Sequence, residues 1–385
     1  MTHPGRVWMV FLGSVALVAL ATATPDATEP GVSPSEIVVG QCAALSGAAA
    51  GQGTGIRAGL LAALEEGNTK GGVWGRKLRL ISADDAYDPE KCVDCTTRLI
   101  EDGAFALTGF VGTPTAKVAA PIAQDMKVPL VGLFTGAMLL RQPAQRYVVN
   151  IRASYDDETD ALVGYLAAKT GARRFAVFHE DDSFGLAGLS SAEKALAKRN
   201  LSLAAKGSYE RNTLAVRSGL SKVMEGAPDA VLIVAPYQPA AEFVRLARAL
   251  GLHSALAAIS YVGTEGLIGE LGPAAEGMTI SQVVPSPADP SLPLVRDFRA
   301  ALQRSAPAEP PSYVSLEGYL SGRVLLAALG RAGADPTREK LLDAIEGMAG
   351  LDVGGMAVSF SANNHQGSQA VYLTQVEQGK AVPAR

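Results

Sequence analysis

The sequence predicts an α/β protein with two doubly wound, parallel-sheet lobes that are joined by a hinge of several chain crossovers. Three observations carry this prediction. Apolar strand-like runs alternate with helical segments from Glu36 to Ile151, the alternation restarts at Arg152, and only helices follow Val284 until strand-like alternation returns near the C-terminus. Two copies of one pattern within 385 residues are typical of two similar lobes, each with its own core.

The first lobe is expected to hold five strands, because five short apolar runs are separated by helical segments or loops. The connections are long enough for right-handed crossovers between parallel strands. The expected strands are Glu36–Cys42, Lys77–Ala83, Ala104–Thr108, Val128–Gly132 and Tyr147–Ile151. The helices expected between them are Gly55–Glu66, Pro89–Asp102 and Thr115–Met126.

The second lobe repeats the same order of elements from Arg152 onward. Its expected strands are Arg174–His179, Leu201–Tyr209, Ala230–Ala235, Ala255–Ile259 and Gly277–Gln282. The helices expected around them are Asp157–Thr170, Gly185–Arg199, Ala215–Glu225 and Pro239–Leu250. This repetition predicts a second sheet that is covered on both faces.

The last hundred residues are expected to cross between the lobes. Helices without strands of their own must cover an existing sheet, so Leu292–Ser305, Ser312–Ala332 and Thr337–Gly347 should return to the first lobe. Alternation at Ala370–Val376 suits a terminal hairpin on the second lobe. We therefore expect lobe 1 to comprise residues 36–152 and 284–355, and lobe 2 residues 153–283 and 356–385. About three crossings would make a hinge that lets the lobes close.

The stretch from Ala104 to Ala137 is the first candidate for a binding site. Gly, Thr and Pro residues fill the loops after its two expected strands, so backbone N–H groups and Thr hydroxyls should lie at the carboxyl ends of parallel strands. Open α/β sheets bind ligands at this edge, and a helix N-terminus favours an anionic group. We expect this stretch to form half of a small-molecule cleft.

The first 35 residues differ from the rest of the chain. Arg6 precedes the apolar run Val7–Ala21, and the small residues Ala21-Thr22-Ala23 fit a signal-peptidase site. We expect residues 1–23 to be a signal peptide and 24–35 a polar leader, which predicts a soluble protein exported to the periplasm. A retained N-terminal anchor is the alternative, although the apolar run is short for a membrane span.

Composition and motifs exclude several classes of function. A net charge of -4 without a Lys/Arg cluster offers no surface for nucleic acid. Gly53–Ala58 matches G-x-G-x-x-A but begins well after the strand that ends at Cys42, which disfavours dinucleotide binding, and neither a G-x-S-x-G nor a phosphate-binding G-x-x-x-x-G-K-[ST] motif occurs. The pairs Asp84-Asp85 and Asp181-Asp182 stand at strand-to-loop boundaries, where solvated turn acids are common. We expect no enzyme activity and no cofactor.

The cysteines suggest a structural role. Cys92 and Cys95 lie inside an expected helix rather than on a strand-to-helix turn, which argues against a redox pair. The four His residues are scattered, so no metal site is expected. In an oxidising compartment, Cys42, Cys92 and Cys95 are expected to supply one disulfide and one buried thiol, with the pairing left open.

Five segments together resemble the leucine/isoleucine/valine-binding family of periplasmic substrate-binding proteins, in the same order and with compatible spacing. They are GRKLRLISADDAYDPEKC (75–92), RYVVNIRASYDDE (146–158), FAVFHEDDSFG (175–185), GSYERNT (207–213) and YVSLEGYLSGRVLLAAL (313–329). The resemblance implies the type 1 periplasmic binding fold and a protein that delivers a ligand to an ATP-driven importer. It also implies two partners: a small ligand, which is an amino acid or a related polar or carboxylate molecule, and a membrane permease. We expect the protein to be a monomer. A ligand-sensing receptor or regulator of the same fold is the alternative.

The resemblance places ligand contacts in the loops that follow strands of both lobes. Hydroxyls and N–H groups after the third and fourth strands would hold a carboxylate, aromatic rings would line the cleft, and Glu265 would meet an ammonium. The matching positions here are Ser46, Gln52, Thr113, Thr115, Phe134, Thr135, Phe184, Tyr237 and Glu265. Tyr155, next to the expected hinge, is a further candidate.

Each of these assignments has a plainer alternative. Thr113 or Thr115 would serve as an ordinary helix cap, and Glu265 as an exposed acid in a first helical turn. Phe184 and Tyr237 would be ordinary core or rim aromatics. Gln52 stands near the position where the family places an aromatic over the ligand, so the sequence does not identify which molecule binds.

Overall fold

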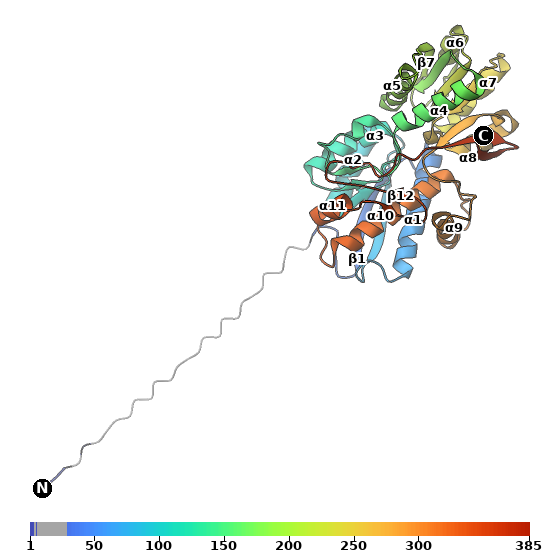
Figure 1. The fold of residues 1–385 in the computed structure, drawn as a ribbon. Helices are drawn as coiled ribbons and strands as arrows, with labels where there is room; N and C mark the ends of the chain where they lie inside the picture. Colours follow the sequence, from blue (N-terminus) through green and yellow to red (C-terminus); the bar gives the residue numbers. More distant parts are fainter. Residues whose placement is uncertain (4, 6–28) are drawn as a thin grey trace.

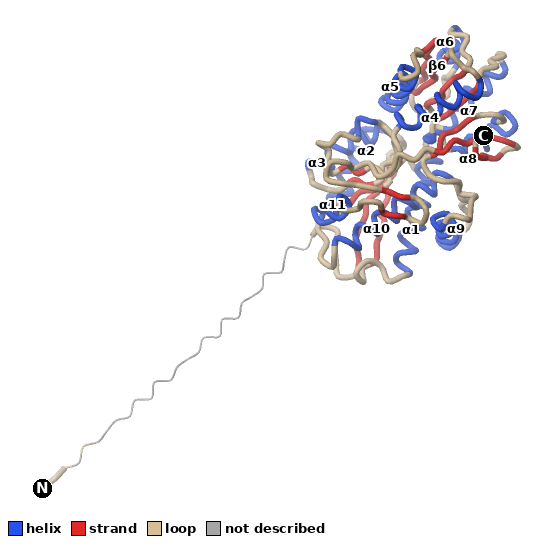
Figure 2. Tube along the Cα trace, in the orientation of Figure 1, coloured by secondary structure: helices blue, strands red, loops and turns tan. Residues whose placement is uncertain are grey.

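Two sheets flanked by helices form the two lobes of the structure, a computed structural model that describes residues 1–3, 5 and 29–385 (Figures 1 and 2). Lobe 1 has a 5-stranded sheet and lobe 2 a 7-stranded sheet, and helices cover both faces of each. This confirms the two doubly wound lobes expected from the sequence. Most of the expected signal peptide (1–23) and the first part of the expected leader (24–35) lie outside the described residues.

The lobe 1 sheet has the order β2-β1-β3-β4-β5, and all neighbouring strands are parallel. Its strands are β1 (Glu36–Ala43), β2 (Lys77–Asp84), β3 (Ala106–Thr108), β4 (Leu130–Val131) and β5 (Val148–Val149). Seven of the eight residues of β1 are buried, as a central parallel strand requires when both faces are covered. All five expected strands are present, and the last three are shorter than expected.

Helices from two distant parts of the chain cover lobe 1. One face packs against α2 (Pro89–Glu101) and α3 (Thr113–Asp125), and the other against α1 and the late helices. These are α1 (Ala50–Thr69), α9 (Pro293–Ser305), α10 (Tyr313–Ala332) and α11 (Arg338–Glu346). Glycine permits the closest contact, because a Cβ on Gly59 of α1 would lie 1.8 Å from the Ser315 carbonyl oxygen of α10.

The lobe 2 sheet has the order β14-β13-β10-β9-β8-β6-β7 and is parallel except for the terminal hairpin. Its strands are β6 (Phe175–Glu180), β7 (Leu203–Tyr209), β8 (Ala230–Val234), β9 (Ala255–Ala258), β10 (Thr279–Gln282), β13 (Tyr372–Glu377) and β14 (Lys380–Pro383). Its helices are α4 (Tyr155–Thr170), α5 (Ser183–Ala197), α6 (Arg217–Glu225), α7 (Tyr237–Ala249) and α8 (Thr264–Leu271). The 3-10 turns are η1 (Met138–Leu140) in lobe 1, and η2 (Ser260–Val262) and η3 (Gly272–Ala275) in lobe 2.

The chain returns to lobe 2 later than the boundary at 356 expected from the sequence. The short pair β11 (Leu351–Asp352) and β12 (Ala357–Val358) is followed by Phe360, which packs in the lobe 1 core. The Asn150 N–H donates to the His365 carbonyl at 2.9 Å, and the Gly367 N–H donates to the Asn150 carbonyl at 2.8 Å. These contacts hold residues 357–367 on lobe 1 before the terminal hairpin joins lobe 2.

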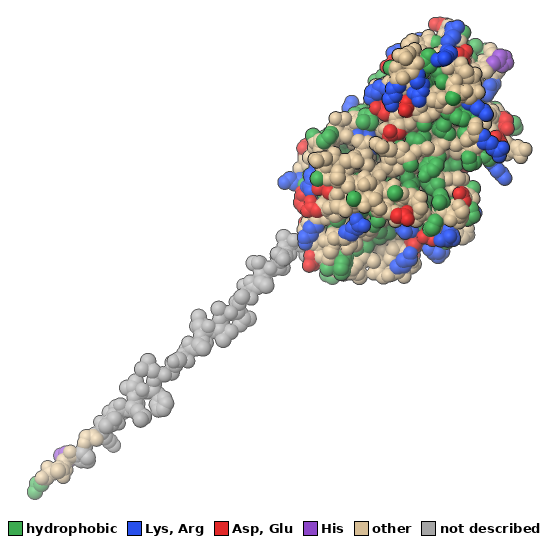
Figure 3. Space-filling view, viewed as in Figure 1, with side chains coloured by type: hydrophobic (Ala, Val, Ile, Leu, Met, Phe, Trp, Pro, Cys, Tyr) green, Lys and Arg blue, Asp and Glu red, His purple; other side chains and the backbone are tan. Residues whose placement is uncertain are grey.

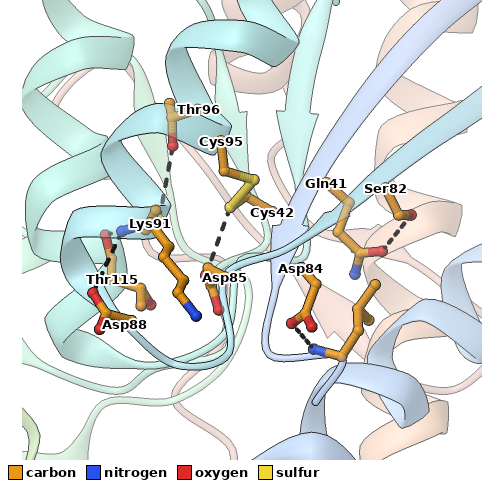
Figure 4. The surroundings of a disulfide bond; sticks show 12 residues. Gln41, Cys42, Ser82, Asp84, Asp85, Asp88, Lys91, Cys95, Thr96 and Thr115 are labelled. Atoms are coloured by element: carbon orange, nitrogen blue, oxygen red, sulfur yellow. Dashed lines mark hydrogen bonds between the residues drawn. A yellow bond between two sulfur atoms is a disulfide. The ribbon is translucent and has the colours of Figure 1, made fainter. Parts of the chain in front are cut away.

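A disulfide joins Cys42 at the end of β1 to Cys95 on α2 (Figure 4). Cys92 is a buried thiol. The expectation of one disulfide and one buried thiol is therefore confirmed. The Cys42 and Cys92 sulfurs and the Asp85 carboxylate lie within 4.8 Å of one another. Because the Cys42 sulfur is in the disulfide, it cannot act as a thiolate ligand, and this group is not a metal site.

The surface carries charge of both signs. On the face drawn in Figure 3, basic side chains are interspersed with acidic ones over both lobes. None of the helices in the described part of the chain has both the length and the apolar character needed to cross a bilayer.

Candidate functional site

Seven buried side chains from both lobes meet where the carboxyl ends of the two sheets face each other. Lobe 1 supplies four of them from the loops after β2 and β4 and from the start of α3, and lobe 2 supplies the others from the starts of α4 and α5 and from η2. Each is at most 1% exposed. We call them the interlobe cluster: Tyr87, Thr113, Phe134, Thr135, Tyr155, Phe184 and Tyr261.

Two threonine hydroxyls form the polar centre of the interlobe cluster. Thr113 is the first residue of α3, Thr135 follows β4, and their hydroxyl oxygens are 2.7 Å apart. The Thr135 hydroxyl also lies 3.3 Å from the Tyr155 hydroxyl, across the lobe boundary. Hydroxyls beside a helix N-terminus suit a carboxylate, because both the O–H groups and the helix dipole favour negative charge there.

Aromatic rings surround this hydroxyl pair. Tyr261 lies centrally, with its ring centroid 4.3 Å from that of Phe184, 5.3 Å from that of Phe134 and 6.4 Å from that of Tyr87. The Phe184 centroid is also 5.8 Å from that of Tyr155, in an edge-on arrangement. Such rings supply a large apolar surface with little loss of side-chain entropy.

A left-handed turn brings Tyr87 into the cluster. Ala86 and Tyr87 have φ values of 50° and 61°, and the Asp85 carboxylate stabilises the turn by accepting a hydrogen bond from the Tyr87 N–H at 2.8 Å. Burial raises the pKa of Asp85 to about 6. The turn places the Tyr87 ring over Gly112, whose φ of 99° favours glycine and where a Cβ would lie 2.2 Å from the ring.

Gln52 connects the lobes at a second point. It lies in the first turns of α1, is 1% exposed, and donates through Nε2 to the carbonyls of Tyr261 at 3.1 Å and Val262 at 3.2 Å. Its Oε1 is buried without a hydrogen-bond partner. The Gln52 side chain thus holds η2 of lobe 2 against lobe 1.

Arg152 anchors the hinge directly behind the interlobe cluster. Its guanidinium donates to the Glu158 carboxylate at 2.8 Å and to the Ser260 hydroxyl, and it lies 3.4 Å from the Glu317 carboxylate on α10. It also stacks 5.0 Å from the centre of the Phe134 ring. Burial raises the pKa of Glu317 to about 7, although the neighbouring Arg152 opposes that rise. One cation therefore pairs with acids of both lobes.

Four residues expected at the site lie apart from the interlobe cluster. The Ser46 hydroxyl is exposed and donates to Asp84 at 2.6 Å, while the Thr115 hydroxyl donates to the Val111 carbonyl at 2.6 Å, as in an ordinary helix start. Tyr237 is half-buried against Gly51 and Gly266. Their part in ligand binding stays a prediction.

Glu265 is the fourth expected site residue that lies apart from the interlobe cluster. Its Oε1 accepts from the Tyr313 N–H at the start of α10, at 3.0 Å, and its Oε2 is buried without a partner. It lines a cavity of about 760 Å³ between α8, α9 and β14 to which no residue of the interlobe cluster contributes. Burial raises the pKa of Glu265 to about 7.

A family model described as "Periplasmic binding protein" matches residues 36–381. The chain belongs to the periplasmic binding protein family. Among curated relatives of this periplasmic binding protein, a Leu/Ile/Val-binding protein of Rhizobium johnstonii is 26% identical over 364 residues, covering 91% of this chain and 94% of the relative. A Leu/Ile/Val-binding protein of Escherichia coli is 23% identical, covering 64% and 67%.

Solved structures of periplasmic binding proteins share the fold over nearly the whole chain. A possible leucine/isoleucine/valine-binding protein from Rhodopirellula baltica superposes with a TM-score of 0.88 at 35% identity, covering 94% of this chain and 98% of that one. A substrate-binding periplasmic protein from Ralstonia solanacearum gives 0.86 at 29% identity, covering 91% and 100%. The expected type 1 periplasmic binding fold and the resemblance to the Leu/Ile/Val-binding family are confirmed.

Sequence reasoning missed three residues of this periplasmic binding protein that the structure places at or behind the interlobe cluster. Tyr87 sits in an acidic turn that reads as solvated, Tyr261 follows a short apolar strand, and Arg152 marks only the restart of the strand–helix pattern. All three residues follow the end of a strand, and this position was the one sequence signal that could have placed them near the cluster. Thr113, Thr135 and Phe184, which were expected there, follow strand ends in the same way.

Proposed function

We propose that this periplasmic binding protein works in the periplasm, where it captures a small amino acid, or a related polar or carboxylate molecule, between its lobes. It then delivers this ligand to the permease of an ATP-driven importer. The observation that carries the proposal is the interlobe cluster. Its hydroxyl pair, Thr113 and Thr135, suits a carboxylate, and rings from both lobes suit an apolar side chain. Closure of the lobes would bury such a ligand completely.

The names of the relatives make branched-chain amino acids the first ligands to test. A thermal-shift screen over amino acids, amides, aromatic acids and short carboxylates tests the capture step. A ligand that binds only the folded protein at a hundred times its Kd adds about 2.7 kcal/mol to the free energy of unfolding. Absence of a shift across the whole screen would overturn the proposal.

The delivery step needs a separate experiment. If a permease and an ATPase are found to be encoded beside this chain, that importer, reconstituted in vesicles, should hydrolyse ATP faster when the ligand-loaded protein is added. If the protein binds a ligand but the complex stimulates neither ATP hydrolysis nor uptake, the proposed transport function is wrong. A ligand-sensing receptor or regulator would then be the better proposal.

A further inference from the structure

A small cavity lies on lobe 1 beside the hinge, where the end of β5 meets the segment that carries the chain back to lobe 2. Its volume is about 60 Å³, and since one water takes about 30 Å³ of the liquid, the cavity has room for one or two small species. One guanidinium, one imidazole and five amide side chains line it, and none of the described Asp and Glu residues does. The guanidinium belongs to Arg141, and the amides include Asn150, Asn363 and Gln366. A lining that is rich in N–H donors and free of carboxylates favours an anion over a cation.

Arg141 is a buried cation whose hydrogen-bond acceptors are all neutral. It follows η1, is 7% exposed, and its Nη2 lies 3.3, 3.1 and 3.2 Å from the carbonyl oxygens of Thr135, Arg152 and Ala153. Its Nη1 donates to Gln366 Oε1 at 3.3 Å, and its Nε is buried without a partner. Within residues 29–385 it forms no salt bridge, whereas the neighbouring Arg152 pairs with two acids. Buried charges in proteins are usually paired, so Arg141 lacks a counter-charge in contact with it.

The acids that act on Arg141 are committed to other partners. The charges of Asp157 and Glu158 act on Arg141, and Arg141 acts on Glu317. Asp157 belongs to the capping box of α4, while Glu158 and Glu317 pair with Arg152. Burial, and then the like charge of Arg152, lower the pKa of Arg141 to about 10. The guanidinium therefore stays positively charged at neutral pH without a carboxylate beside it.

We propose that this cavity is a binding site for a small monovalent anion, such as chloride or bromide, which Arg141 and the surrounding amide N–H groups hold. Gln366 gives its amide oxygen to Arg141, so its NH2 group is left to donate to the anion. Asn150 Oδ1 is buried without a partner, and it would accept from a water beside the anion, for which the cavity has room. His365 takes no part, because its imidazole lies 3.1 Å from the Glu346 carboxylate.

An anion in this cavity would stabilise the hinge. Arg141 already joins three parts of it: the loop after β4 through Thr135, the first crossing through Arg152 and Ala153, and the returning segment through Gln366. A bound anion would offset the cost of burying an unpaired guanidinium. Because the cavity exists only in the folded protein, anion binding would also raise stability by mass action. This site does not depend on the solute that the lobes capture.

Thermal melts at constant ionic strength test the site. Sodium gluconate is replaced stepwise by sodium chloride or sodium bromide, and gluconate serves as the inert anion because it is too large for the cavity. We expect the melting temperature of the unaltered protein to rise and then level off, with a gain of about 1–3 °C at about ten times the Kd. A general salt effect would change the melting temperature without saturation.

Gln366→Glu supplies the negative charge covalently. A carboxylate at this position would pair with Arg141, so the variant should melt at a higher temperature than the unaltered protein in gluconate and show no further rise with chloride. Gln303→Glu, at an exposed position on α9, makes the same change away from the cavity and should keep the rise. Equal, saturating rises in the unaltered protein and in Gln366→Glu would overturn the anion site.

Crystals of the unaltered protein soaked in bromide give a readout that needs no variant. Anomalous scattering should place a bromide ion against the Arg141 guanidinium and the Gln366 amide. A cavity without bromide, or a melting temperature that does not respond to chloride, would overturn the proposal. A bromide peak in the cavity without a rise in melting temperature would identify an adventitious ion only, and it would overturn the proposal as well. Solute capture between the lobes would remain intact in each case.

Discussion

Among single residues, Arg152 has the most demanding surroundings. It is 1% exposed, and its acid partners Glu158 and Glu317 are 0% and 5% exposed. The Glu158 carboxylate is otherwise satisfied by lobe 2, since it accepts from the Ser260 N–H at 2.8 Å and the Ser281 hydroxyl at 2.6 Å. Buried charges are tolerated only when they are paired and hydrogen-bonded, so we expect this network to fix the position of the hinge.

Replacing Arg152 should therefore be costly. Arg152→Met keeps an unbranched apolar stem but removes the guanidinium, which leaves two buried acids without their cation. We expect the free energy of unfolding to fall by about 3–5 kcal/mol. Urea denaturation measures the change. Arg79→Met is the control, because its pair with Glu36 is exposed and should contribute less than about 1 kcal/mol. Equal effects of the two substitutions would show that the network carries no special energy.

Glu265 offers a test of pH dependence. Burial raises its pKa from 4.5 to about 7 in the folded protein. The carboxyl therefore destabilises the fold increasingly as the pH rises from 4.5 to about 7, and by a constant amount above 7. Glu265→Gln keeps an acceptor for the Tyr313 N–H and removes the charge. We expect the variant to be more stable than the unaltered protein by about 1–3 kcal/mol at pH 8, from the size of the shift.

This gain should shrink as the pH falls from about 7 to 4.5 and vanish below 4.5, where the unaltered carboxyl is protonated in both the folded and the unfolded state. Thermal melts of both proteins between pH 4.5 and pH 8 measure the difference. A gain that stays constant with pH would show that the charge of Glu265 is not the cause.

At the scale of elements, the regular parts of the fold were predictable and the special turns were not. Apolar runs and helical spacing identified the strands from β1 to β10 and the helices around them, because buried parallel strands and amphipathic helices leave periodic patterns. The Tyr87 turn leaves no such pattern. It depends on positive φ values at Ala86 and Tyr87, which the Asp85 carboxylate and the packing of the ring sustain together.

The interlobe cluster was predictable only in part for the same reason. Thr113, Thr135 and Phe184 follow strand ends, and the rule for open α/β sheets places such residues in the cleft. Whether a side chain after a strand end joins the interlobe cluster or forms its hydrogen bonds elsewhere depends on partners far away in the sequence. Glu265 illustrates this, since its partner Tyr313 is 48 residues away.

The start of α3 gives a prediction at this scale. Gly112 and Gly71 have nearly equal φ values, 99° and 98°, but a Cβ at Gly112 would meet the Tyr87 ring whereas nothing lies within 4 Å at Gly71. Gly71→Ala should lower the free energy of unfolding by about 1–2 kcal/mol through backbone strain alone. Gly112→Ala should cost about 1–3 kcal/mol more, because the ring must move and because the ψ of 153° at Gly112, combined with a positive φ, is a conformation nearly restricted to glycine. Urea denaturation of both variants separates the two costs, and equal losses would mean that Tyr87 adjusts freely.

At the scale of the whole molecule, the two lobes are held together by a few polar contacts around an aromatic interior. Gln52, the Arg152 network and the Glu265–Tyr313 hydrogen bond each join one lobe to the other. We expect the chain crossings between the lobes to act as a hinge, so these contacts should act on the balance between open and closed forms. Ligand binding and lobe closure should then be coupled.

Gln52→Ala tests this coupling. The variant loses two hydrogen bonds across the lobe boundary, each with a net contribution of about 0.5–1.5 kcal/mol, so we expect a bound ligand to be held about tenfold less tightly. Small-angle scattering should show the radius of gyration falling when ligand saturates either protein, with a higher ligand concentration needed for the variant. Gln142→Ala, at an exposed side chain that bonds only within lobe 1, is the matched control. If Gln52→Ala weakens binding but both proteins keep the same scattering profile with and without ligand, Gln52 acts on the site directly, and the lobes do not close around what they bind.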